Sequence, residues 1–171
     1  MYQKYTHEVK RWNEVMLNAP VVGDPVKHRS DQQNIAKILR QSKFVVEEAK
    51  EIQEGAETND IREMLDGHLD TRFVNDQIGV YLEAMGIDLE GAWQEVCRSN
   101  NSKFSTDFDM MVESAKDLSE RVGDEVVVQI APHAEGCPTT YILKRLSNGK
   151  IMKPSCFSEP DLTPFIPERL L

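Results

Sequence analysis

The chain has 171 residues and a formal net charge of −9, with 40% hydrophobic and 29% charged residues. This length suits one domain with its own core, and the acidic balance argues against a nucleic-acid-binding surface, which would be basic. Cys97, Cys137 and Cys156 are widely spaced, which argues against a zinc site or a disulfide framework and favours a reducing cytoplasm. No long apolar run and no apolar N-terminal segment occur, so we expect a cytoplasmic protein that neither contacts a membrane nor carries a cleaved signal.

Helical spacing of apolar residues dominates the first part of the chain. Caps and breakers divide it into helices predicted at residues 3–18, from Ser30 to about Gly55, from Thr58 to Gly86, and from Asp88 to about Asn101. Short connections between these helices favour an antiparallel bundle.

The pattern changes after Lys103. We predict a helix at 106–122, strands at 125–131, 139–146 and 150–153, and a hairpin turn at the Asn148-Gly149 step, with a Pro-containing arm from Ser158 onward. The expected fold is therefore all-α: an antiparallel helical bundle over residues 1–103. A small C-terminal extension with a β-hairpin, residues 104–171, packs on the same domain.

Two clusters of carboxylates stand on successive helices. Glu47, Glu48 and Glu51 lie on the second helix, and Glu63, Asp66 and Asp70 lie on the third. Residues three or four apart share a helix face, and Asp66 and Asp70 fall on a stripe with Phe73, Gln77, Val80 and Ala84. Carboxylates beside a core-facing stripe need a partner, and hard oxygen ligands from two helices suit Mg²⁺ or Mn²⁺. The alternative is an ordinary solvated acidic face.

The order of these motifs resembles a known family. Glu47-Glu48-x-x-Glu51 followed by an acidic pair on the next helix is similar to the MazG-like all-α nucleoside triphosphate pyrophosphohydrolases. Gly86-Ile-Asp-Leu-x-x-Ala-Trp-x-Glu-Val and then Ser99-Asn-Asn-Ser-Lys resemble its phosphoribosyl-ATP pyrophosphohydrolase-like branch, which is frequent in bacteriophages. Gly149-Lys-x-x-Lys-Pro with a following Pro160-Asp-Leu is similar to the ending common in that branch.

The resemblance implies a reaction and a set of residues. Water would attack a phosphate of a (deoxy)nucleoside triphosphate, releasing a nucleoside monophosphate and pyrophosphate with the help of Mg²⁺. Glu48, Glu51, Asp66 and Asp70 would be metal ligands, and Glu47 would be a ligand or the base that orients the water. The usual family pattern, Glu-x-x-Asp, instead matches Glu63 and Asp66, so the ligands from the third helix stay open between these two pairs.

The resemblance also implies substrate-binding residues and partners. Asn100, Lys103, Lys150 and Lys153 would contact the nucleotide and its phosphates, and Lys37 and Arg40 either meet a phosphate or pair with the glutamates. Such enzymes complete their site with a second subunit, so a homodimer or homotetramer is expected, in the host cytoplasm if a phage encodes the chain. Phosphoribosyl-ATP or an alarmone is the alternative substrate, and a non-catalytic acidic interaction protein is the alternative class.

Overall fold

The computed structural model describes residues 8–12, 15, 30–131 and 138–171. By their contacts the residues form two compact units, Met1–Leu89 with Thr163–Leu171, and Glu90–Leu162. Most of the predicted first helix, residues 3–18, lies outside the described residues. Its described residues, 8–12 and 15, are helical.

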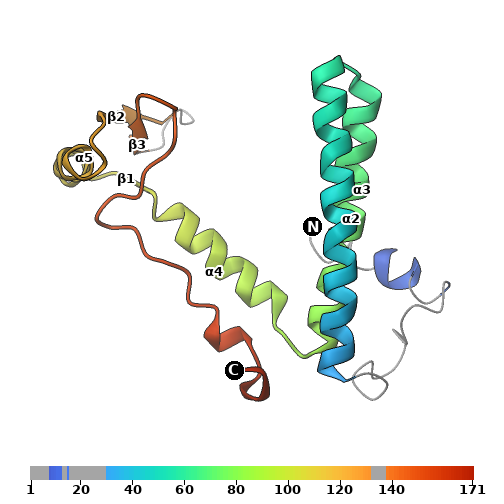
Figure 1. The fold of residues 1–171 in the computed structure, drawn as a ribbon. Coiled ribbons are helices and arrows are strands. Elements are labelled where there is room, and N and C mark those ends of the chain that lie inside the picture. The colour runs from blue at the N-terminus through green and yellow to red at the C-terminus, as the bar shows by residue number, and fades with distance from the viewer. Residues whose placement is uncertain (1–7, 13–14, 16–29, 132–137) are drawn as a thin grey trace. The chain divides into compact units, whose positions relative to one another are not determined.

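The first unit is built on a long helical hairpin, α2 (Asp31–Thr58) and α3 (Ile61–Ala84), whose helices run side by side in Figure 1. Helix α2 begins at a capping box, in which the side chains of Ser30 and Gln33 each accept from the other's backbone N–H. It ends at Asn59, whose left-handed backbone (φ 57°) turns the chain, and Asp60 then caps α3. The predicted start of α2 at Ser30 is confirmed, whereas α3 begins three residues after the predicted Thr58, because α2 continues to Thr58 and Asp60 is the cap.

Two glycines let the helices of this hairpin approach closely. A Cβ on Gly67 would lie 2.9 Å from the backbone nitrogen of Ile52 and 3.0 Å from the carbonyl oxygen of Glu48. A Cβ on Gly55 would lie 2.7 Å from the backbone nitrogen of Met64. Since real Cβ atoms do not come so near to backbone, both contacts require glycine.

The C-terminal residues are held to this first unit. Arg169 donates to the carboxylate of Asp31 and to the carbonyl oxygen of Met85, and the N–H of Asp88 donates to the carbonyl of Phe165. Residues 163–171 therefore lie on the first unit and include two short 3₁₀ turns, η2 (Thr163–Phe165) and η3 (Glu168–Leu170).

The second unit combines helices with a small sheet. Helix α4 (Leu89–Asn101) is followed by β1 (Phe104–Ser105), α5 (Phe108–Val122), β2 (Val126–Ile130) and β3 (Tyr141–Arg145). The strands form an antiparallel sheet in the order β1-β3-β2, with Val128 opposite Leu143. Helix α5 and the sheet enclose a core of Met111, Ala115, Leu118, Val126 and Leu143. The predicted β-branched strand buries Val126 against α5 because alternate residues face one side.

The structure is mostly helical with this small sheet, which agrees with the predicted fold in its coarse form. It differs in detail. The first unit defined by contacts ends at Leu89, and α4 shares polar contacts with the segment 158–161. The predicted strand at 150–153 is reduced to a single bridge between Ile151 and Lys144. Among the described residues, no helix is long and apolar enough to cross a membrane.

Candidate functional site

The carboxylates of α2 and α3 meet across the hairpin. Glu48 is half-buried, and burial is the main cause that raises the pKa of its carboxyl. The negative charges of Glu51, Asp70, Glu47 and Asp66, in that order, raise the pKa further. Two of these four carboxylates, Asp70 and Asp66, lie on α3. The pKa of Glu48 is therefore raised by charges from both predicted clusters.

The members of this carboxylate cluster (Glu47, Glu48, Glu51, Asp66 and Asp70) are not equally buried. Glu48 and Glu51 are half-buried, whereas Glu47, Asp66 and Asp70 are exposed. The stripe on α3 is therefore core-facing only at its C-terminal part, where Gln77, Val80 and Ala84 are buried. A two-helix hairpin buries only the faces that meet, which leaves Asp66 and Asp70 at the edge.

Glu63 has a different environment from the cluster. It is exposed, its backbone N–H is capped by Asp60, and it packs beside Gly55. Among the described carboxylates, it is not one of those that raise the pKa of Glu48.

The cluster has the ligand chemistry of a divalent-cation site without a closed coordination shell. Its oxygen donors are of the type that Mg²⁺ prefers. Within the described part of the chain, however, no three His, Cys, Asp or Glu side chains stand close enough to hold a metal ion.

Lys37 and Arg40 lie on the same helix as the glutamates but contact aromatic rings. The Nζ of Lys37 is 5.9 Å from the centre of the Tyr81 ring, and the guanidinium carbon of Arg40 is 5.8 Å from the centre of the Phe44 ring. All four residues line one pocket of the first unit.

In the second unit, three of the predicted substrate-binding residues gather around Phe157. Lys103 donates to the side-chain oxygen of Asn100 at 2.6 Å. The Nζ atoms of Lys103 and Lys153 lie 6.0 and 4.2 Å from the centre of the Phe157 ring, and Lys153 also pairs with Glu159. Lys150 is exposed in the hairpin turn, and no described contact joins it to this group.

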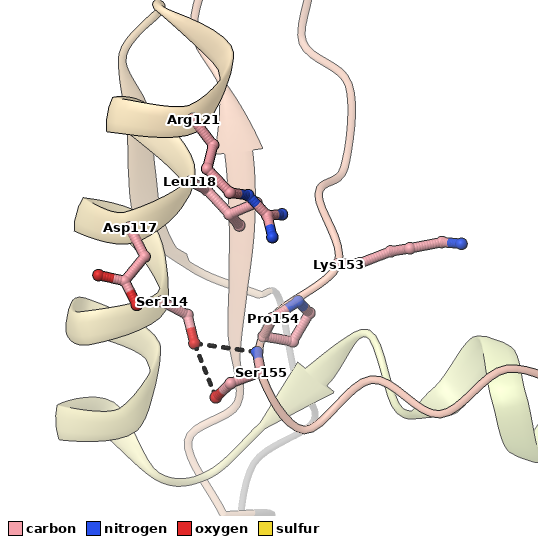
Figure 2. A pocket seen from close by; sticks show the side chains of 7 residues that line it. All are labelled: Ser114, Asp117, Leu118, Arg121, Lys153, Pro154 and Ser155. Carbon is pink, nitrogen blue, oxygen red and sulfur yellow. Dashed lines mark hydrogen bonds between the residues drawn. The ribbon is translucent and has the colours of Figure 1, made fainter.

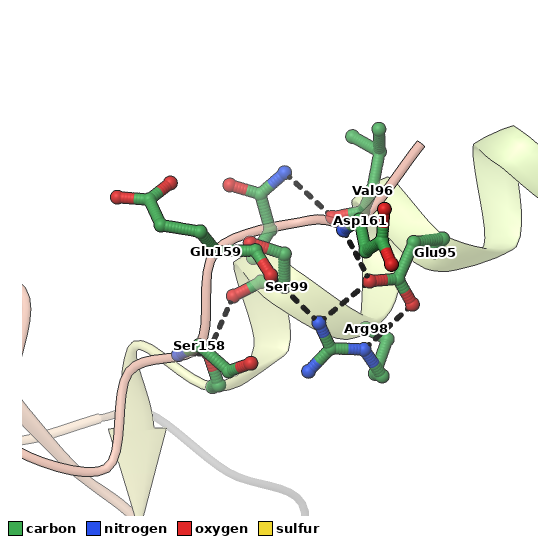
Figure 3. A network of polar contacts seen from close by, with 9 residues as sticks. Glu95, Val96, Arg98, Ser99, Ser158, Glu159 and Asp161 are labelled. Carbon is green, nitrogen blue, oxygen red and sulfur yellow. Dashed lines mark hydrogen bonds and ion pairs between the residues drawn. The ribbon is translucent and has the colours of Figure 1, made fainter. Parts of the chain in front are cut away.

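Polar contacts fix the segment 158–161 on α4, as Figure 3 shows. Arg98 forms a two-pronged ion pair with Glu95, with both N–O distances at 2.7 Å, and also donates to the carbonyl oxygen of Glu159. The N–H of Asp161 donates to Glu95, and the N–H of Ser158 donates to Ser102. The hydrogen bonds from Arg98, with the one from the Asp161 N–H, lower the pKa of Glu95 to about 2.

A pocket of about 250 Å³ lies between α5 and the segment 153–155. Figure 2 shows Ser114 at its centre, donating to the hydroxyl of Ser155 and accepting from the Ser155 N–H. In Figure 2 the amine of Lys153 points away from Ser114, and the hydrogen bonds between Ser114 and Ser155 hold the segment 153–155 against α5.

The structure adds three residues that the sequence reasoning did not assign. Gly67 brings α3 against Glu48 and Glu51, and the buried amides of Gln41 and Gln77 line the pocket beside the carboxylate cluster. Two features of the sequence could have pointed to these residues. One is the glycine that stands between Asp66 and Asp70, and the other is the presence of glutamines on helix faces that are otherwise largely apolar.

Comparison with known proteins does not test the family resemblance, because no family model, curated protein or solved structure matches the chain.

Proposed function

We propose that the protein is a Mg²⁺-dependent nucleoside triphosphate pyrophosphohydrolase. One observation carries the proposal: the half-buried carboxyl of Glu48 is surrounded by like charges from both helices, which raise its pKa. An arrangement that costs stability in the free protein is typical of a functional site.

In this proposal Glu48, Glu51, Asp66 and Asp70 would hold the metal. When bound, Mg²⁺ would offset the charge of the triphosphate and lower the pKa of the attacking water. Glu47, which is exposed beside them, would orient that water. The environment of Glu48 favours Asp66 and Asp70 over Glu63 as the ligands from α3.

The motif resemblance adds the phosphate-binding residues. By that resemblance Lys103 and Lys153, which lie near Phe157 in the second unit, would bind phosphates, since phosphoryl transfer depends on positioned charge. Asn100 positions Lys103 through their hydrogen bond.

The proposal is tested by pyrophosphate release from canonical and modified nucleoside triphosphates, with and without Mg²⁺. We expect metal-dependent release that is lost in Glu48→Gln and kept in Glu54→Gln, an exposed glutamate further along α2. Full activity of Glu48→Gln would refute the metal assignment.

A non-catalytic acidic interaction protein is the second candidate. The exposure of Asp66 and Asp70, and the absence of a ready three-ligand group among the described residues, favour it. It predicts a folded protein that neither binds Mg²⁺ specifically nor releases pyrophosphate from any substrate.

A further inference from the structure

The first unit contains a pocket of about 300 Å³, at the lower end of the usual range for ligand sites. Aromatic rings and amides share its lining. Its aromatic members are Trp12, Phe44, Phe73 and Tyr81, and its amide members are Gln41 and Gln77.

The two amides are almost fully buried where they line the pocket. Gln41 is 7% exposed and Gln77 is 6% exposed. A buried amide needs hydrogen bonds, and each amide offers one acceptor and two donor hydrogens. The pocket is therefore suited to a ligand whose edge carries both donors and acceptors.

The aromatic rings supply flat apolar walls. Trp12 and Phe73 meet edge to face, with ring centres 5.6 Å apart, and Tyr81 is 4% exposed. Rings of this kind stack on planar heterocycles, and base stacking on aromatic side chains is tolerant of the base's identity. A ligand that suits both the aromatic walls and the amides is a flat ring with hydrogen-bonding groups along its edge, and a nucleobase is such a ring.

The pocket lies at a defined distance from the carboxylate cluster. Gln41 precedes Glu48 by two helical turns, and Gln77 follows Asp70 by two turns. Because α2 and α3 are antiparallel, both amides are displaced from the carboxylates in the same direction, by ~10 Å along the hairpin. Lys37 and Arg40, which also line the pocket, place positive charge there.

We propose that this pocket binds the base of the nucleotide substrate, with the side-chain amides of Gln41 and Gln77 hydrogen-bonding to the edge of the base. The inference rests on the proposed function and names the part of the site that selects the substrate. Gln41 and Gln77 are then specificity-determining residues, and the triphosphate extends from the pocket toward Glu48 and Asp70.

The test uses free nucleosides, which carry no phosphate and need no metal. The chain has two tryptophans, so Trp93→Phe leaves Trp12 as the only one and makes its fluorescence a reporter of the pocket. We titrate this single-tryptophan protein with each ribo- and deoxynucleoside up to its solubility limit, in EDTA. We expect saturable quenching with one base preferred, weakened at least tenfold by Gln41→Leu or Gln77→Leu.

Controls separate the pocket from the fold. Gln53→Leu changes an exposed glutamine of the same helix, so its binding should equal that of the parent. If either leucine variant fails to fold by circular dichroism, Gln41→Met or Gln77→Met replaces it, because methionine keeps the length of the side chain.

The outcomes distinguish this inference from the proposed hydrolysis. Nucleoside binding lost in the leucine variants supports the pocket even if no triphosphate is hydrolysed. Hydrolysis without nucleoside binding or base preference overturns the pocket and leaves the reaction standing. A Trp12 signal that follows protein concentration and ignores nucleosides also overturns it, since a second copy of the chain would then fill the pocket.

Discussion

Glu48 shows how a single side chain links the stability of the fold to the proposed chemistry. Its carboxyl is pushed toward the protonated form by burial and by four neighbouring carboxylates. Because the folded state raises its pKa above the ordinary value of 4.5, the folded state binds its proton more tightly than the unfolded state does. The stabilisation from that proton is complete below pH 4.5 and is lost as the pH rises through the raised pKa.

Glu48→Gln should therefore stabilise the metal-free protein at neutral pH. Like-charge pairs on helices cost ~0.2–0.5 kcal/mol each, so we expect a rise of about 1–2 °C in the melting temperature. The gain should shrink toward pH 4, where Glu48 itself becomes protonated. Thermal melts in EDTA at several pH values check this, with Glu54→Gln as the control. A variant less stable than the parent at pH 7 would contradict the charge argument.

Mg²⁺ should stabilise the parent much more than it stabilises Glu48→Gln. A ligand that binds only the folded state stabilises it by about 2.7 kcal/mol at a concentration of 100 Kd. The parent should therefore melt at a higher temperature in Mg²⁺ than in EDTA, and Glu48→Gln should lose most of that difference. Equal shifts in the two proteins would place the metal elsewhere.

At the scale of elements, the contact between α2 and α3 depends on glycine at the carboxylate cluster. A Cβ at position 67 would meet backbone atoms of Ile52 and Glu48, which cannot move without shifting α2 as a whole. The separation of the two acidic groups is thus set by Gly67 between Asp66 and Asp70.

Gly67→Ala should push the helices apart and weaken the site. Overpacking costs about 1–3 kcal/mol, and the better helix propensity of alanine returns up to about 1, so we expect a net loss of about 1–2 kcal/mol. Pyrophosphate release should fall with it. Urea unfolding measures the stability, and His68→Ala, an exposed change one residue away, is the control. Unchanged stability would show that the helices are not in close contact there.

The ion pair between Glu95 and Arg98 fixes a second element, the segment 158–161. The pKa of Glu95 is lowered to about 2, so the contribution of its charge to folding is present above the ordinary value of 4.5 and disappears as the pH falls through about 2. We expect hydrogen exchange to find the Asp161 amide protected at pH 4 and released near pH 2. Glu95→Gln should release it at pH 4 already, and Glu90→Gln, on the same helix, should not.

Short sequence motifs and helical periodicity predicted much of the secondary structure. Ser30 and Asp60 have the side chains that cap helices, and the Asn148-Gly149 step predicted the turn that the positive φ of Gly149 makes. Helical periodicity likewise assigned Glu48, Asp66 and Asp70 to the faces on which they meet. The contact across the hairpin and the pocket at Gln41 and Gln77 depend on the register between two helices, which a one-dimensional pattern does not contain.

For the whole molecule, the contacts divide the chain into two compact units. The predicted boundary followed the change of pattern after Lys103. The observed units follow long-range polar contacts instead, with Arg98 binding the chain near Glu159 and Arg169 binding Asp31. Contacts between residues so far apart leave no periodic signal, so the composition of the segments could not reveal them.

The hairpin also carries an exposed apolar stripe on the outer face of each helix. These outer faces consist of Ile35, Leu39 and Val46 on α2 and of Ile61, Leu65 and Leu69 on α3, and each of these side chains is more than half exposed. On a helical wheel at about 100° per residue, the stripes lie opposite Gln41 and Gly67, which face the partner helix. Exposed apolar stripes of this kind mark an interface, and the proposed function includes a homo-oligomer.

We therefore expect copies of the chain to associate through these outer faces, joining hairpins into a larger helical bundle while the pocket and the carboxylates stay open. Light scattering after size exclusion should give a dimer or larger assembly for the parent. Leu39→Glu with Leu65→Glu should give a monomer, because a buried carboxylate without a partner opposes association. Leu146→Glu, an equally exposed leucine in the second unit, should leave the assembly intact. If the parent is a monomer, or if the doubly substituted variant still assembles, these outer faces are not the interface. If the variant is a monomer that still binds nucleosides, each hairpin forms its pocket without a second copy of the chain.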